Sequence, residues 1–134
     1  MARATWFCID IEASGPVPGL YDMVSLGAVV VHDTPQGLAL GDSFYVEMRP
    51  QGPRVDPRAM QIHGLTLEHL QANGLDRREA LQRLDAWVRE QFERVPVDQR
   101  VIVTGHDAFA YFGQAYGIEV HGLIGISTEQ APLP

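Results

Sequence analysis

The chain has 134 residues, nearly half of them hydrophobic, with a formal net charge of −7 and a single cysteine. This length supports one modest hydrophobic core, so a single domain is expected over residues 1–124. The negative charge argues against a broad electrostatic surface for nucleic acid, but it leaves room for a small site that handles phosphates through metal ions. No stretch reaches the roughly 20 apolar residues of a membrane helix and no signal peptide is visible, which predicts a cytoplasmic protein without a membrane partner.

The first predicted element is a strand in which an apolar run from Trp6 leads into Asp10-Ile11-Glu12. Its nearly continuous apolar character is typical of a strand covered on both faces, with Cys8 as a small buried residue. Alternate side chains of a strand share a face, so Asp10 and Glu12 are expected on the same side. Two carboxylates placed in this way favour a divalent-metal site. The alternative is that they occupy the wet face of an edge strand.

Two more strands are predicted over residues 23–32 and 42–48, with a turn at 33–37 between them. Together with the first strand they form an antiparallel meander. Short helices are expected around 57–62 and from Thr66, which caps the second of them.

A long helix is the next predicted element. It begins with a capping box formed by Asp76 and Glu79 and stops before Pro96. Its predicted apolar stripe consists of Leu81, Leu84, Trp87, Val88 and Phe92.

The C-terminal part predicts a strand-helix-strand unit. A short strand at 101–103 precedes a helix over 107–116, and a parallel strand follows over 118–123. Residues 125–134 contain two prolines without periodicity, which predicts an extended or disordered tail.

Three segments, Phe7–Gly15, Met23–Val31 and Ile62–Thr66, resemble the DnaQ-like 3′–5′ exonucleases of the DEDD superfamily. The resemblance extends to about Leu84. It implies an α/β, ribonuclease H-like fold, with a mixed sheet of three antiparallel strands followed by parallel strands with helices, truncated at the C-terminus. It also implies a hydrolase that uses Mg²⁺ or Mn²⁺ to shorten single-stranded nucleic acid from its 3′ end.

In that family four acidic residues hold two metal ions, which activate the attacking water and stabilise the departing 3′ oxygen. Asp10 and Glu12 match the first pair. Gly105-His106-Asp107 resembles the turn near the third ligand, but Asp107 comes earlier than the family's acidic residue, and a helix-capping role is the alternative. The fourth acidic residue and the general base belong to a later helix that has no counterpart here. The resemblance therefore implies at most half of the catalytic set.

From about Leu84 the chain is similar to a second family, the zinc and manganese solute-binding proteins of ABC transporters. The most specific segment is the run of residues 106–112, His-Asp-Ala-Phe-Ala-Tyr-Phe. The His of this run ligates metal in that family, which makes His106 an alternative ligand and Zn²⁺ an alternative ion. A single matching ligand and the lack of an export signal argue against a transporter component.

Two functions follow from these resemblances. One is an exonuclease-like phosphodiesterase with an incomplete catalytic set. The other is a catalytically silent chimera, natural or engineered, that binds metal or serves as a structural, oligomerising module. A truncated last helix would leave an apolar face uncovered, which predicts homo-oligomers.

Simpler roles are expected for the other candidate groups. His63 is predicted to pack in a turn, His69 to lie on the exposed side of a short helix, and His121 to follow a strand without a special role. The arginines between Arg77 and Arg94 alternate with acidic residues, which predicts a solvated helix with ion pairs.

Overall fold

The structure is a computed structural model that describes residues 5–104 and 110–122. Its elements group into two compact units, one up to Trp87 and one from Val88 onward, and the long helix α3 contributes to both. In chain order the elements are β1 (Thr5–Ala13), β2 (Met23–Thr34), β3 (Gly37–Glu47), α1 (Pro57–His63), α2 (Leu67–Asn73), α3 (Arg77–Glu93), a 3-10 turn (Val97–Gln99), β4 (Val101–Thr104), α4 (Ala110–Tyr116) and β5 (Glu119–Gly122).

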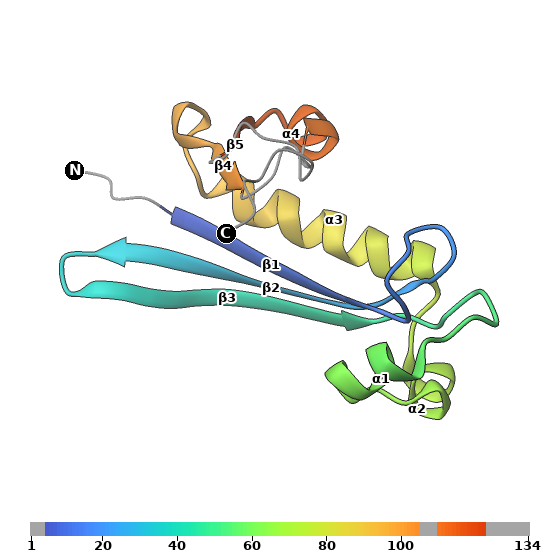
Figure 1. Ribbon diagram of the computed structural model, residues 1–134. Helices are drawn as coiled ribbons and strands as arrows, with labels where there is room; N and C mark the ends of the chain where they lie inside the picture. The colour runs from blue at the N-terminus through green and yellow to red at the C-terminus, as the bar shows by residue number, and fades with distance from the viewer. Residues whose placement is uncertain (1–4, 105–109, 123–134) are drawn as a thin grey trace, which may run out of the picture. The chain divides into compact units, whose positions relative to one another are not determined.

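The first unit is built on a three-stranded antiparallel sheet in the order β1-β2-β3, as the meander predicts. Gly37 closes the β2–β3 hairpin with a φ of 114°, a conformation that favours glycine. Figure 1 shows α3 along one face of this sheet, with α1 and α2 on the other side near the C-terminal end of β1. The two faces of the sheet therefore have different surroundings.

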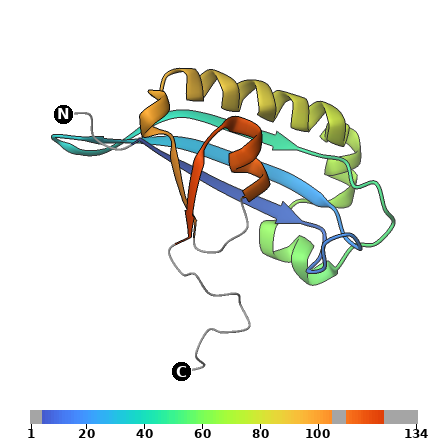
Figure 2. The ribbon, with the colours of Figure 1, turned by 90° about the horizontal axis from the view of Figure 1, so that it is seen from above.

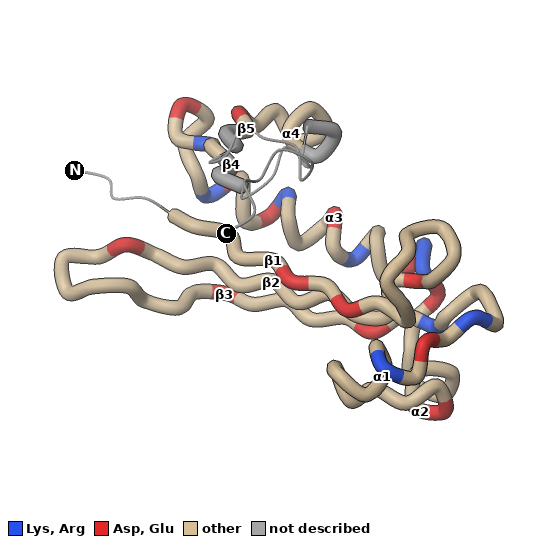
Figure 3. The backbone as a smooth tube through the Cα atoms, in the orientation of Figure 1, with Lys and Arg blue, Asp and Glu red and all other residues tan. Residues whose placement is uncertain are grey.

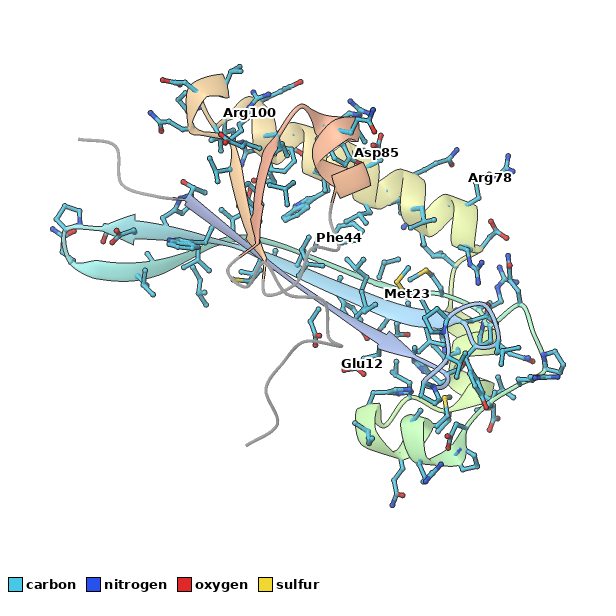
Figure 4. The ribbon with its side chains drawn as sticks, turned by 45° about the horizontal axis from the view of Figure 1, so that its top comes forward. Glu12, Met23, Phe44, Arg78, Asp85 and Arg100 are labelled. Atoms are coloured by element: carbon cyan, nitrogen blue, oxygen red, sulfur yellow. The ribbon has the colours of Figure 1, made fainter. Side chains whose placement is uncertain are left out.

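The core of the first unit lies between the sheet and α3. Its buried members are Leu26 and Ala28 from β2, Val46 and Met48 from β3 and its flank, and Ala80 from α3. The rings of Phe44 and Trp87 pack against this cluster with their centroids 5.7 Å apart. Figure 4 shows Met23 and Phe44 on the side of the sheet that faces α3.

Strand β1 differs from its sequence prediction. Its side chains are half-buried or exposed throughout, and Cys8 is exposed rather than buried. The reason is its position, since β1 pairs with β2 at the edge of the three-stranded sheet while α3 packs on β2 and β3. Figure 2 shows β1 at the edge of this sheet that lies away from α3.

Short-range hydrogen bonds define where the helices begin. The Asp56 carboxylate accepts from the Arg58 N–H at 2.8 Å and holds α1, and this bond keeps the pKa of Asp56 below its usual value. Thr66 Oγ1 accepts from the His69 N–H at 3.1 Å and caps α2 as predicted.

The predicted capping box of α3 is present only in part. Asp76 accepts from the Arg78 N–H at 2.9 Å, whereas Glu79 pairs with Arg83 one turn later at 2.6 Å. One predicted member of the apolar stripe, Leu81, is exposed, because the buried face of α3 centres on Ala80, Leu84 and Trp87.

The second unit contains β4 and β5, which pair in parallel with Val101 opposite Glu119. Helix α4 lies between them and ends at Tyr116, directly before Gly117, whose φ is 63°. The aromatic ring of Tyr116 contacts Phe92 at 5.8 Å between centroids and lies under the Arg89 guanidinium at 5.3 Å. The described strands form two sheets, so a single mixed sheet stays a prediction.

Some predictions fall outside the described residues, among them His106, Asp107 and the tail at 125–134. Within the described part, no helix combines the length and apolar character needed to cross a membrane.

Candidate functional site: an acidic face of the antiparallel sheet

Asp10 and Glu12 lie on the sheet face opposite the core. Strand register sets Asp10 against Gly27 and Glu12 against Ser25 on β2. Directly opposed residues of an antiparallel pair point to the same face, while Ile9 and Ile11 point to the face of Leu26 and Ala28. Asp10 is exposed and Glu12 is half-buried. Figure 4 shows Glu12 near the end of β1, and in Figure 3 the acidic positions of β1 appear in red.

The same face continues across β3 with Tyr45 and Glu47. Gly27 is opposite Tyr45, and Ser25 is opposite Glu47. The three strands therefore place two rows side by side, Asp10-Gly27-Tyr45 and Glu12-Ser25-Glu47. Tyr45 and Glu47 are not among the residues predicted from the sequence. The alternation of polar residues at 43, 45 and 47 indicates a solvent-facing side, but only the register brings these residues level with the Asp10/Glu12 pair.

A chain of polar contacts holds the Tyr45 side chain. The Tyr45 hydroxyl donates to Glu47 Oε1 at 2.9 Å, and Glu47 Oε2 lies 2.5 Å from His69 Nε2. Asn73 supports the imidazole from the next turn of α2, with its Nδ2 atom 3.3 Å from His69 Nδ1 and 3.1 Å from the His69 carbonyl, to which it donates. His69 is exposed on α2 as predicted, but it also contacts the sheet.

This environment changes the acidity of Tyr45. Desolvation is the largest contribution, and the hydrogen bond and negative charge of Glu47 follow; together they raise the pKa of Tyr45 above its usual value. The Ser25 side chain acts in the opposite direction, and the Glu12 charge adds to the increase. The phenol is therefore kept neutral beside the carboxylates.

A set of hydrogen bonds fixes the loops at the C-terminal end of β1. Ser14 is fully buried, and its Oγ accepts from the Asp22 N–H at 2.9 Å and donates to the Arg54 carbonyl at 3.4 Å. Asp22 accepts from the N–H groups of Gln51 and Gly52 at 3.0 and 2.9 Å. Its other oxygen binds Arg77 at the start of α3, so three segments meet beside the candidate site.

His63 and the arginines of α3 have structural roles in the described part of the chain. His63 packs in a turn as expected, because its Nε2 lies 3.3 Å from the Ala13 carbonyl oxygen and its Nδ1 accepts from the Leu65 N–H. The arginines of α3 form ion pairs, with Arg83 bound to Glu79 and Arg94 to Glu90. His121 lies within β5, opposite Val103, rather than after a strand as predicted, and its side chain is outside the described part of the structure.

The chemistry of Asp10 and Glu12 fits a hard divalent cation. Carboxylate oxygens are preferred ligands of Mg²⁺ and Mn²⁺, and Mg²⁺ commonly keeps several water ligands beside one or two carboxylates. Among the described residues no group of three or more His, Cys, Asp or Glu side chains is arranged to hold a metal ion. The third predicted ligand, Asp107 or alternatively His106, is not described.

The C-terminal half of the chain matches a known protein family. Residues 66–134 match the ZnuA family, described as zinc-uptake complex component A, periplasmic. The chain belongs to this family. The ZnuA match begins at residue 66, earlier than the change of resemblance predicted near Leu84, and it includes α2 and α3.

Individual relatives show both resemblances. The chain is 44% identical over 72 residues to the manganese-binding lipoprotein MntA of Bacillus subtilis (strain 168). The aligned residues are 54% of this chain and 22% of MntA. The chain is also 33% identical over 100 residues to the 3′-5′ DNA exonuclease Cap18 of Escherichia coli. The aligned residues are 75% of this chain and 49% of Cap18. The MntA match covers 54% of this chain and the Cap18 match covers 75%, so the two matched segments overlap. The chain spans about half of Cap18 and about a fifth of MntA.

Solved structures support the exonuclease resemblance at the level of the fold. A full-length 3′-exonuclease matches 68% of this chain with a TM-score of 0.55 and 14% sequence identity, and the match covers 31% of that protein. The α/β architecture with three antiparallel strands is therefore shared with exonucleases. The chain has a mixed character, exonuclease-like and solute-binding-protein-like.

Proposed function

We propose that this chain is a divalent-metal-dependent phosphodiesterase that shortens single-stranded nucleic acid from its 3′ end. The observation that carries the proposal is the placement of Asp10 and Glu12 together on the face opposite the core of an exonuclease-like sheet. The similarity to Cap18, whose name is that of a 3′-5′ DNA exonuclease, supports the substrate class. A ribonuclease H-like mixed sheet, one domain over 1–124 and a cytoplasmic location are parts of this proposal.

Asp10 and Glu12 would hold Mg²⁺ or Mn²⁺ in this proposal, with Asp107 as a third ligand. The metal supplies charge neutralisation at the phosphate and a nucleophile derived from water. The protein's part is to orient the two carboxylates, and the hydrogen bonds of Ser14 and Asp22 stabilise the loop that follows β1.

A nuclease assay tests the proposal. The purified chain is incubated with 5′-labelled single-stranded DNA or RNA and Mg²⁺ or Mn²⁺, and shortening from the 3′ end is expected. Asp10→Ala and Glu12→Ala should each abolish it, because the remaining carboxylate offers too few ligands. Asp33→Ala, on the hairpin end of β2, is the control and should keep activity. Absence of shortening, or shortening that Asp10→Ala leaves unchanged, would refute the proposal.

A second function is favoured by the ZnuA match over residues 66–134. In this alternative the chain binds Zn²⁺ or Mn²⁺ through His106 and is catalytically silent. Calorimetric titration of the wild type, Asp10→Ala and His106→Ala with both ions separates the two sites. Loss of binding only in His106→Ala supports the alternative, and loss only in Asp10→Ala supports the phosphodiesterase.

A further inference from the structure

We propose that Tyr45 is a stacking platform for a nucleobase of the bound strand, next to Asp10 and Glu12. The inference rests on the proposed function, because it assigns to that site a residue that contacts the base. Tyr45 occupies β3, in the same cross-strand row as Asp10.

The first observation is the space between Asp10 and Tyr45. The residue between them is Gly27, which places no side chain on this face. A Cβ built on Gly27 would lie 3.9 Å from Cδ2 of Tyr45, so the aromatic ring lies beside the position that a larger residue would occupy. Two strand spacings separate β1 from β3, about 10 Å. This span is comparable to the reach from a phosphate to the base of one nucleotide.

The second observation is that the ring is both exposed and fixed. Tyr45 is 62% exposed on β3, an outer strand of the three-stranded sheet. Its hydroxyl is anchored by Glu47, which is in turn held by His69. A ring fixed in this way loses little conformational entropy when a planar group stacks on it. Stacking on an aromatic ring tolerates every base, as a shortening enzyme requires.

The third observation concerns charge. The carboxylates of Glu12 and Glu47 make this face unfavourable for a bare phosphate chain, and the ring offers a contact that does not depend on attracting phosphate. Base stacking on Tyr45 and metal-mediated phosphate contact at Asp10 are therefore complementary. A nucleobase fits this arrangement better than an apolar peptide, which would gain nothing from the adjacent carboxylates.

Binding of a 5′-fluorescent single-stranded oligonucleotide tests the inference. The oligonucleotide carries a phosphorothioate at its last linkage to slow hydrolysis, and affinity is read by anisotropy in Mn²⁺. Tyr45→Ala should weaken binding roughly 5- to 150-fold, the range for loss of one base stack. Tyr45→Phe keeps the ring and should retain most of the affinity. Leu40→Ala is the matched control, since Leu40 is a 79% exposed apolar residue on the same strand, and it should bind like the wild type.

A second oligonucleotide identifies the contact as a base stack. Its 3′-terminal nucleotide lacks the base, and on this oligonucleotide Tyr45→Ala should cause little further loss. Equal affinity of Tyr45→Ala and wild type, or an equal loss with and without the terminal base, would overturn the inference. Circular dichroism of Tyr45→Ala should match the wild type, and a loss of affinity in Tyr45→Phe as large as that in Tyr45→Ala would also count against stacking.

Failure of the inference is distinguishable from failure of the proposed function. Shortening that depends on Asp10, with binding that does not depend on Tyr45, retains the phosphodiesterase and rejects the stack. Binding that depends on Tyr45 and on the terminal base, without any shortening, retains the stack and rejects the phosphodiesterase. Absence of oligonucleotide binding by the wild type rejects the stack directly.

Discussion

Tyr45 and Glu47 illustrate how one face of the sheet combines contacts from distant parts of the sequence. One carboxylate oxygen of Glu47 accepts a hydrogen bond from the Tyr45 hydroxyl. The other carboxylate oxygen lies 2.5 Å from Nε2 of His69 on α2. On the same face, Glu12 contributes negative charge to the surroundings of the phenol. The neutral phenol is therefore favoured in the folded state.

The raised pKa of Tyr45 predicts a pH dependence of stability. Unfolded tyrosine loses its proton near pH 10, whereas folded Tyr45 keeps its proton to higher pH. The contribution of Tyr45 to the free energy of unfolding is therefore fully present below about pH 10 and is lost as the pH rises through the folded pKa. Denaturant unfolding at several alkaline pH values measures this loss, which should be smaller in Tyr45→Phe.

Absorbance titration of tyrosinate gives a second measure of the same effect. Glu47→Gln removes the charge and should move the pKa of Tyr45 toward its usual value. Ser43→Ala, an exposed residue of the same strand, should leave the titration unchanged. A Glu47→Gln titration that overlays the wild type would contradict the assigned cause.

At the scale of the elements, the end of α2 is joined closely to the end of β3. After Gly74, Leu75 runs beside β3, where its N–H donates to the Glu47 carbonyl and its own carbonyl accepts from the Arg49 N–H, both at 2.9 Å. Leu70 of α2 is fully buried. This junction positions α2 so that His69 contacts Glu47 on the sheet face that also carries Asp10 and Glu12.

Gly74→Ala is predicted to disturb this junction. A Cβ at residue 74 would lie 2.4 Å from the Leu70 carbonyl oxygen and 2.7 Å from the Arg49 nitrogen, and both are backbone atoms that cannot move away alone. Overpacking of this kind costs about 1–3 kcal/mol of the free energy of unfolding. Denaturant unfolding measures the cost. Gly52→Ala is the control, since its nearest neighbour would be a side-chain oxygen at 3.6 Å, and an equal effect of both variants would contradict this explanation.

At the scale of the whole molecule, the exposed edge strand β1 predicts association between copies of the chain. Ile11 is 54% exposed, and Trp6 and Ile9 on the same strand are also exposed. An exposed edge with apolar side chains is a template for pairing with another strand.

Light scattering after size exclusion is expected to show a mass above that of the monomer that increases with concentration. Ile11→Lys should shift the equilibrium toward the monomer, because a charge on an edge strand disfavours pairing. Leu81→Lys, on the exposed side of α3, serves as the control and should associate like the wild type. A monomer at high concentration, or equal effects of both variants, would refute association through β1.

Much of the fold was predictable from local patterns. Alternation and turn residues predict β2 and β3, and the Thr66 and Asp76 side chains mark the starts of α2 and α3. The exposure of β1 and Cys8 was not predictable in the same way, because an apolar strand has the same sequence pattern whether neighbours cover it or not. Leu81 is exposed for a related reason, since the packing partners of α3 decide which part of its stripe is buried.

The sequence by itself determined that Asp10 and Glu12 share one face, because side chains alternate along any strand. It also determined the two family resemblances, which depend on residue identity and order. Only the tertiary structure decided that Tyr45 and Glu47 lie level with this pair and that His69 reaches Glu47. These neighbours are set by strand register and by the placement of α2, and neither is encoded in the short segments that carry the motifs.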